Sequence, residues 1–508
     1  MKKRLLMRLG CLICACFFLT GCAVRSSAPT AAATLPPLES KWTPQENDMN
    51  QDYFQSVNLY LPSLDGARLL AVPVTARLSA SRHSAQTLCE LLFSHQGTDS
   101  TQPVSGGVTL RLSETDAIEI SGSVVTVNLG AAALRLSHEE LFTVGQALAN
   151  TLCQFGDLEY VNILIAGKQP GLDIASTLPA GCFQPNTRED LGLLWARASA
   201  PKTTARRAIP AALYYPAAQG KGVLCEARTL SFSSLSIPAM AETLLAALSS
   251  GAEKLPHVPR CPEMNAYLSW EPSLKEEGGK RILTLHFINE LNGALLEAGI
   301  TRSVMMASLA YTMLTFLPGL DGLEVFIGDE QITSVSPSGT YTGAGNTISF
   351  AEGVLRRKDF QAFLLSHCTL YFPDAAGRLV AVTRPIPCYS AFNPRVLLEQ
   401  LMLGPQAIDG MDGLKRSLPA GLKDADLLGV SFQDCTLILN FSNQLPALAQ
   451  GMPENQERLM VYSIVNTLCQ LPAIEKVSFF IMGRQPESFA GALYLPGDFL
   501  PNLNLVNP

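Results

Sequence analysis

Charged residues are scarce in this chain of 508 residues, at 16% of the total. No long basic run occurs, the formal net charge is -7 and the pI is about 5.5. Nucleic-acid binding depends on Lys and Arg gathered against phosphates, so we expect no nucleic-acid partner. Hydrophobic residues make up 47%, which is typical of a folded chain, and the length suits about three domains.

The sequence also lacks the motifs of common enzyme chemistry. Its histidines form no H-E-x-x-H pair for zinc, and no G-x-S-x-G turn is present for a serine hydrolase. The one S-x-x-K match, Ser199 to Lys202, contains a proline that keeps the two side chains off one helical turn. Gly343-Ala344-Gly345 lacks the third glycine of a dinucleotide loop. We therefore expect no catalytic residue, no metal and no cofactor.

Of the 13 cysteines, those that follow Cys22 contain no C-x-x-C pair, which argues against zinc ribbons and thioredoxin chemistry. Beyond Cys22 there remain Cys89, Cys153, Cys182, Cys225, Cys261, Cys368, Cys388, Cys435 and Cys469. An odd number cannot all pair within one chain, and the sequence leaves open whether any do. Cys153 and Cys469 have apolar neighbours in two matching predicted helices, so we expect small buried side chains there.

Only one long apolar run is present, and it follows a basic start at residues 1–4. The run, residues 9–19, is too short for a permanent membrane helix, which needs about 20 apolar residues. It ends in Leu19-Thr20-Gly21-Cys22, which matches the bacterial lipobox, where small residues precede a cysteine that takes lipid. We predict that residues 1–21 are a signal peptide and that lipid on Cys22 anchors the chain. The alternative is an ordinary secretory signal with an incidental cysteine.

The segment after the lipobox favours a tether between the lipid anchor and the folded part of the chain. Residues 22–50 are rich in Ala, Ser, Thr and Pro, a composition that cannot bury a core and favours a flexible tether. We therefore expect an extracytoplasmic protein attached to the cell membrane through Cys22.

Internal repetition is the main organisational signal. A Leu-Tyr-x-Pro motif occurs three times at nearly equal spacing, at Tyr60 and Pro62, Tyr214 and Pro216, and Tyr371 and Pro373. Asn150-Thr151-Leu152-Cys153-Gln154 returns as Asn466-Thr467-Leu468-Cys469-Gln470, with Thr312 in a weaker middle copy. A third signature ends each copy, at Gly167, Gly328 and Gly483. The landmarks predict three modules, at residues 51–200, 201–347 (divergent) and 348–508.

Each copy contains the same predicted elements. After a strand ending in Tyr-x-Pro come a glycine turn, a second strand, a short helix, a further strand, the longest helix and a final strand. The short helices are predicted at residues 85–94, 240–249 and 395–403, and the last two strands at 124–129 and 160–166, 282–288 and 323–327, and 436–441 and 477–482. Ser137 and Glu140 form a capping box at the first long helix. The predicted fold class is α/β (α+β): three tandem small modules, each a sheet of about four strands with two helices packed on one face.

These recurring motifs resemble the GerMN domain family, which is named for spore germination and sporulation proteins. The resemblance covers residues 55–485 and is specific for the first and third copies, but weaker for the second. It implies an extracytoplasmic α/β module without catalytic activity, similar in fold to the ring-building modules of spore and secretion channels.

Two functions from different classes remain. The first is a structural assembly factor that contacts other envelope proteins, in sporulation or germination as the resemblance implies, and that can form a homo-oligomer. The second is a receptor for a peptidoglycan fragment, sugar or germinant, which should have a deep pocket between modules with clustered aromatics. Aromatic residues are only 7% of the chain, which favours the first. The repeated Tyr, Asn, Thr, Pro and Gly residues are interpreted as structural.

Overall fold

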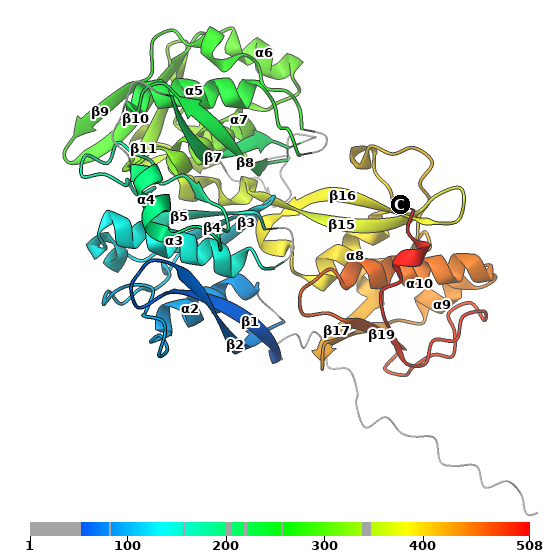
Figure 1. Cartoon of the computed structure of the whole chain (residues 1–508). Helices are drawn as coiled ribbons and strands as arrows, with labels where there is room; N and C mark the ends of the chain where they lie inside the picture. The colour runs from blue at the N-terminus through cyan, green and yellow to red at the C-terminus, as the bar shows by residue number, and fades with distance from the viewer. Residues whose placement is uncertain are drawn as a thin grey trace, which may run out of the picture. The chain divides into compact units, whose positions relative to one another are not determined.

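The computed structural model describes residues 52–80, 83–155, 158–199, 206–217, 221–255, 258–337 and 347–507 (Figure 1). All the described residues belong to one compact unit. Among them no helix is both long and apolar enough for a membrane span. The predicted signal peptide, Cys22 and the tether lie outside the described residues.

Three modules follow one another, and each has the same order of elements. Each begins with an antiparallel hairpin and a short helix, followed by a four-stranded sheet. In each of the three four-stranded sheets the two central strands are parallel, and each outer strand is antiparallel to its neighbour. A long helix connects the two central strands, because parallel neighbours require a crossover connection.

The elements have the following bounds. Module 1 contains β1 (Asp52–Pro62), β2 (Leu69–Ser79), α2 (Ser84–Ser94), β3 (Ile118–Ser121), β4 (Val124–Leu129), α3 (His138–Leu152), β5 (Tyr160–Ile165), β6 (Cys182–Phe183) and α4 (Leu191–Ser199). Module 2 contains β7 (Arg207–Pro216), β8 (Val223–Phe232), α5 (Ile237–Ser249), β9 (Ser273–Glu277), β10 (Lys280–Phe287), α6 (Leu291–Glu297), α7 (Arg302–Phe316), β11 (Gly322–Ile327), β12 (Glu330–Gln331), β13 (Ser334–Val335) and β14 (Ile348–Ser349). Module 3 contains β15 (Leu365–Pro373), β16 (Leu379–Pro387), α8 (Pro394–Leu403), β17 (Leu427–Gln433), β18 (Thr436–Phe441), α9 (Gln444–Ala449), α10 (Glu454–Leu468), β19 (Lys476–Ile481) and β20 (Asp498–Phe499). Short 3-10 turns are η1 (Ala131–Arg135), η3 (Met264–Tyr267), η4 (Ala351–Gly353), η5 (Arg357–Phe363), η6 (Cys388–Ser390), η7 (Ala407–Asp409), η8 (Asp424–Asp426) and η9 (Leu503–Leu505).

The long helices bury the apolar stripe that the sequence predicts. Val144, Leu148 and Leu152 of α3 are at most 1% exposed, and Met460 and Ile464 of α10 are fully buried. Burying one such side chain contributes about 1.5–3 kcal/mol. The capping box at the start of α3 is present, with the Ser137 side chain accepting a hydrogen bond from the Glu140 amide.

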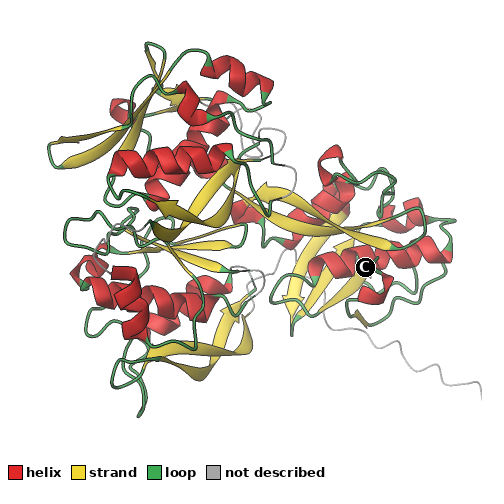
Figure 2. Ribbon diagram, turned by 45° about the horizontal axis from the view of Figure 1, so that its top comes forward, coloured by secondary structure: helices red, strands yellow, loops and turns green. Residues whose placement is uncertain are grey.

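The predicted fold class is confirmed, and the middle module keeps the strand order of the other two. One detail differs from the prediction. The hairpin of each module is a separate two-stranded sheet beside the four-stranded one (Figure 2). It lies against the long helix, to which side-chain hydrogen bonds attach it.

The segment after β14 packs with module 2, although the spacing of the repeats predicted that it belongs to module 3. Leu355 forms an antiparallel bridge with Leu323 in β11, and η5 packs on α7. Leu364 then forms a parallel bridge with Val223 at the start of β8. Val506, at the end of module 3, makes the equivalent bridge with Leu379 in β16, so the tails of both modules return to their own hairpins.

Candidate functional site

The threonine of the repeated helix motif attaches each hairpin to its long helix. Its hydroxyl oxygen accepts a hydrogen bond from the backbone N–H of the motif tyrosine. The three pairs are Thr151 with Tyr60 (3.1 Å), Thr312 with Tyr214 (3.0 Å) and Thr467 with Tyr371 (3.3 Å). All three threonines are fully buried, so each tyrosine amide gives a buried hydroxyl its partner. The prolines at Pro62, Pro216 and Pro373 are each the last residue of their strands.

The asparagine of the same motif binds the tail of its module. Asn150 accepts a hydrogen bond from the Asn186 amide (2.7 Å) and donates to the Asn186 carbonyl (3.0 Å). Asn466 makes the same two bonds with Asn502, at 2.8 and 3.1 Å. Each tail asparagine follows a proline, so Pro-Asn is a further repeated signal in the sequence, in addition to the three signatures described above. In module 2 the helix position is Tyr311 instead.

The terminal glycines form turns after the last central strand. The Gly167 amide donates to the Asn128 side chain (2.9 Å), and the Gly483 amide donates to Asn440 (2.8 Å). Both glycines have positive φ, near 80°, which a side chain would disfavour. Gly328 lies one position earlier in its turn than these two.

The equivalence follows from the hydrogen bonds. The Gly328 amide donates to the Phe287 carbonyl, as the Ala166 amide does to Leu129 and the Met482 amide to Phe441. Gly328 therefore corresponds to Ala166 and Met482.

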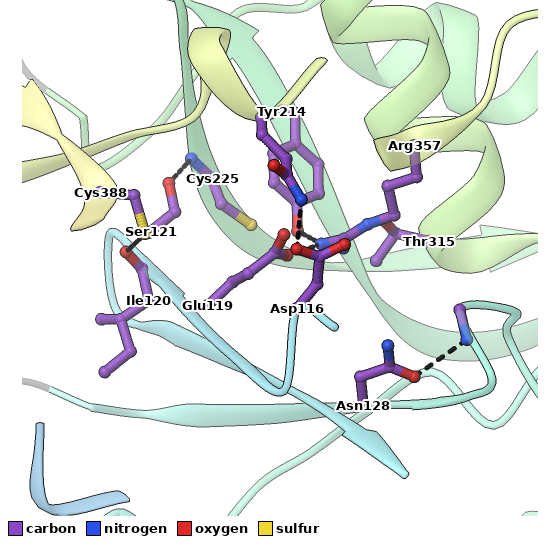
Figure 3. A network of polar contacts seen from close by, with 12 residues as sticks. Asp116, Glu119, Ile120, Ser121, Asn128, Tyr214, Cys225, Thr315, Arg357 and Cys388 are labelled. Atoms are coloured by element: carbon purple, nitrogen blue, oxygen red, sulfur yellow. Dashed lines mark hydrogen bonds and ion pairs between the residues drawn. The ribbon is translucent and has the colours of Figure 1, made fainter. Parts of the chain in front are cut away.

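A polar junction joins the modules at the end of β3 (Figure 3). The Ser121 hydroxyl donates to the Leu365 carbonyl of module 3 and accepts from the Cys225 amide of module 2, at 3.0 Å for the latter. The Cys388 thiol of module 3 donates to the Ile120 carbonyl at 3.0 Å. One short strand of module 1 thus contacts both other modules through directional bonds.

A buried ion pair lies next to this strand. The Arg357 guanidinium pairs with the Glu119 carboxylate, and their side chains are 9% and 3% exposed. Arg357 also donates to the Thr315 hydroxyl (3.0 Å), and its guanidinium carbon lies 4.7 Å from the centre of the Tyr311 ring. Burial alone would lower the pKa of Arg357, but the negative charge of Glu119 outweighs it and raises that pKa well above the ordinary value.

The protonation states of the groups at this junction suit a structural contact between modules. Burial raises the pKa of the Tyr214 hydroxyl, which lies 3.4 Å from Arg357, and raises the pKa of the Cys388 thiol to about 12. Both groups are therefore protonated at neutral pH, and neither has the lowered pKa of an activated nucleophile. Breaking a buried pair such as Arg357–Glu119 typically costs about 3–5 kcal/mol, so the pair opposes separation of modules 1 and 2.

A cavity of about 400 Å³ lies between modules 1 and 3, next to the junction. His83, Tyr389 and Phe392 contribute its aromatic walls. Burial lowers the pKa of His83 to about 4, and its Nδ1 accepts the Ala85 amide at 3.0 Å as the cap of α2. The imidazole lies 4.4 Å from the Phe392 ring in an edge contact. The cavity has the clustered aromatics expected of the receptor alternative.

The nine cysteines of the described part of the chain are all free thiols. Cys153 and Cys469 are partly buried, and burial raises the pKa of each to about 12. They fill apolar space at the ends of α3 and α10. In the same residues no group of three or more His, Cys, Asp or Glu is placed to hold a metal ion.

Comparison with known proteins gives a family. The Germane family model, described as sporulation and spore germination, matches residues 58–170 and 369–487. Among solved structures, the tandem GerMN domains of the sporulation protein GerM from Bacillus subtilis match at 16% identity, over 60% of this chain and 99% of that one, with a TM-score of 0.22. The first GerMN domain of the same protein matches at 27% identity, over 27% and 97% of the two chains, with a TM-score of 0.22.

The solved structure of a putative lipoprotein from Clostridium perfringens matches at 21% identity, over 27% of this chain and 87% of that one, with a TM-score of 0.19. No curated protein matches the chain. The two segments that the family model matches are those that carry the complete Asn-Thr motif, and the middle module repeats their strand order. Two of the three modules therefore match the Germane, or GerMN-domain, family, and the chain contains the family's module in repeat.

Proposed function

We propose that this chain is a non-enzymatic envelope lipoprotein, anchored by lipid on Cys22, that acts as an assembly factor for extracytoplasmic protein complexes in sporulation or germination. The family supports the biological setting. The observation that carries the assembly role is that the repeated residues are occupied by contacts inside the modules, while the junction at Ser121 joins the modules to one another. A jointed array of this kind presents several surfaces in a defined arrangement.

The test combines anchoring with recovery of partners. Tagged chain is crosslinked in cells during sporulation and during growth, and membrane fractions are isolated. We expect defined envelope proteins to be recovered with the native chain and lost with Cys22→Ala, which should leave the membrane fraction. Cys435→Ala, a change at a partly buried thiol elsewhere, is the matched control. Unchanged fractionation of Cys22→Ala would refute the anchor, and recovery of no protein under any condition would refute the assembly role.

The receptor is the second candidate, because the cavity between modules 1 and 3 has three aromatic side chains on its wall. Calorimetric titration with muropeptides and germinant amino acids distinguishes it. Micromolar binding that is lost in Phe392→Ala and Tyr389→Ala, together with no protein partner, would favour the receptor over the assembly factor.

A further inference from the structure

A groove runs along one side of module 1, between α2 and the extended segment that precedes β3. Its volume is about 860 Å³. Gln86, Glu90, Phe93 and Ser94 line it from α2, at helical spacing on one face. Residues 108–114 line the opposite side.

The extended segment at residues 110–114 forms backbone hydrogen bonds along the edge next to β4, and none along the other edge with any described residue. The Ser113 amide donates to the Asn128 carbonyl, and the Arg111 carbonyl accepts from the Gly130 amide. Because backbone groups of successive residues in an extended chain point to opposite edges, the N–H and C=O of Leu110 and Leu112 point away from β4, toward α2. Neither residue forms a backbone hydrogen bond on that edge with any residue that the structure describes.

The other two modules close the equivalent groove. In module 2, Leu268 holds the position of Leu112, since it bridges to Phe287 as Leu112 does to Leu129. There η3 packs directly on α5, and the Leu268 amide donates to the Asn265 carbonyl.

In module 3 the equivalent residue is Leu427, which pairs with Phe441. Its carbonyl accepts a hydrogen bond from Arg395, the second residue of α8, at 2.8 Å. The corresponding helix position of module 1 is Ala85, which is too short to reach. The open edge of module 1 is thus a specific departure from its own repeats.

The residues that line the groove indicate what kind of ligand it can bind. An unpaired edge facing a helix is the arrangement that takes an extended peptide as an added strand. Residues 108–112 span about 16 Å, at about 3.3 Å per residue, enough for roughly five residues of a bound strand. Phe93, Val108 and Leu112 offer apolar surface, while Glu90 and Glu114 outnumber the one basic lining residue, Arg111.

We propose that this groove binds an extended, basic and apolar peptide segment of a partner protein by strand addition. The inference rests on the proposed assembly function and names the contact site and the chemistry of its partner. Main-chain bonds to Leu110 and Leu112 supply the affinity, and Glu90 and Glu114 select basic side chains.

The probe is a fluorescein-labelled hexapeptide of alternating lysine and valine, measured by fluorescence anisotropy against the full chain. We expect saturable binding, at least tenfold weaker binding of the glutamate–valine analogue, and loss of binding when the lysine–valine peptide is N-methylated at alternate amides. Bound peptide should also slow amide exchange at Leu110 and Leu112.

Two variants target the protein side. Leu112→Pro removes the backbone N–H that has no hydrogen bond and leaves every backbone hydrogen bond of the module in place. The variant should bind the labelled peptide at least tenfold more weakly, while its circular dichroism spectrum stays unchanged. Glu90→Lys with Glu114→Lys should reverse the preference between the two peptides. The matched control is Glu277→Lys, an exposed carboxylate on the outer strand of module 2, which should leave binding unchanged.

No saturable binding of either peptide overturns the proposal, and so does binding that survives both N-methylation and Leu112→Pro. A synthetic peptide of residues 23–50 that binds the groove more tightly than the probe would also overturn it, because the occupant would then be the chain itself. If the peptide does not bind the groove while envelope proteins are still recovered by crosslinking, the assembly function stands and only this contact site is wrong.

Discussion

The buried ion pair between modules 1 and 2 gives the sharpest test of the junction. In Glu119→Leu the Arg357 guanidinium keeps its contacts with the Thr315 hydroxyl, the Tyr214 hydroxyl and the Tyr311 ring but loses its ion-pair partner. Leaving one buried charge unpaired costs about 3–5 kcal/mol, a large part of the roughly 5–15 kcal/mol that stabilises a typical domain. In the double variant Glu119→Leu with Arg357→Met both charges are removed, so most of that loss should be recovered.

The assay needs a local measurement, because a chain of three modules does not unfold in one two-state step. Urea unfolding followed by circular dichroism shows which transition shifts, and the change in free energy is taken from amide exchange. Amide exchange of Cys225, whose N–H donates to Ser121, reports opening of the junction itself. A loss below about 1 kcal/mol in Glu119→Leu would refute the reasoning. So would a double variant as unstable as the single one, since the cost would then come from packing and not from the unpaired charge.

Three further predictions test the repeated contacts. Thr467→Val leaves the Tyr371 amide without its acceptor and should lower the unfolding free energy of module 3 by about 1–3 kcal/mol, measured by urea unfolding. Asn466→Ala frees the tail of module 3 and should increase proteolytic cleavage near Asn502, whereas Asn455→Ala, at the exposed start of the same helix, should not. His83 is buried in its neutral form with a pKa of about 4, so the unfolded state binds more protons than the folded state below about pH 6.5. The free energy of unfolding should therefore fall between about pH 6.5 and about pH 4, by at most about 3 kcal/mol. His83→Asn, which copies the Asn393 cap of module 3, should keep the helix and remove that part of the pH dependence; an unchanged pH profile would contradict the assignment.

Local patterns in the sequence were sufficient for the elements of the modules. The helix predicted at 85–94 is observed as Ser84–Ser94, and the strand predicted at 124–129 as Val124–Leu129. Both depend on periodic apolar residues and nearby turn residues, which are short-range signals. The strand order of the middle module could be predicted as well, because its landmarks kept their spacing.

The junction could not be predicted, because its partners are far apart in sequence. Arg357 and Glu119 are separated by 238 residues, and no periodicity relates them. A charged residue among apolar ones predicts an exposed side chain as readily as a buried pair. The burial of α7 on all sides was missed for the same reason, since η5 covers the face that would otherwise reach solvent. The groove beside α2 depends on Leu112 lacking a partner, which only the structure can show.

In the middle module, other contacts replace those made by the repeated helix motif. The repeated motif of modules 1 and 3 places asparagine and glutamine one helical turn apart, and in module 3 Asn466 binds the module tail while Gln470 donates to the Thr369 carbonyl of the hairpin.

In module 2 the same two positions are Tyr311 and Thr315, and both contact Arg357. The positions that hold a module together in the other copies therefore hold the junction in this one. Tyr311 also stacks on Tyr214, with ring centres 4.9 Å apart, so the hairpin keeps a contact with the helix at the place where the asparagine is lost. The middle copy thus lacks the motif without looser packing, because the residues at these positions are buried and in contact.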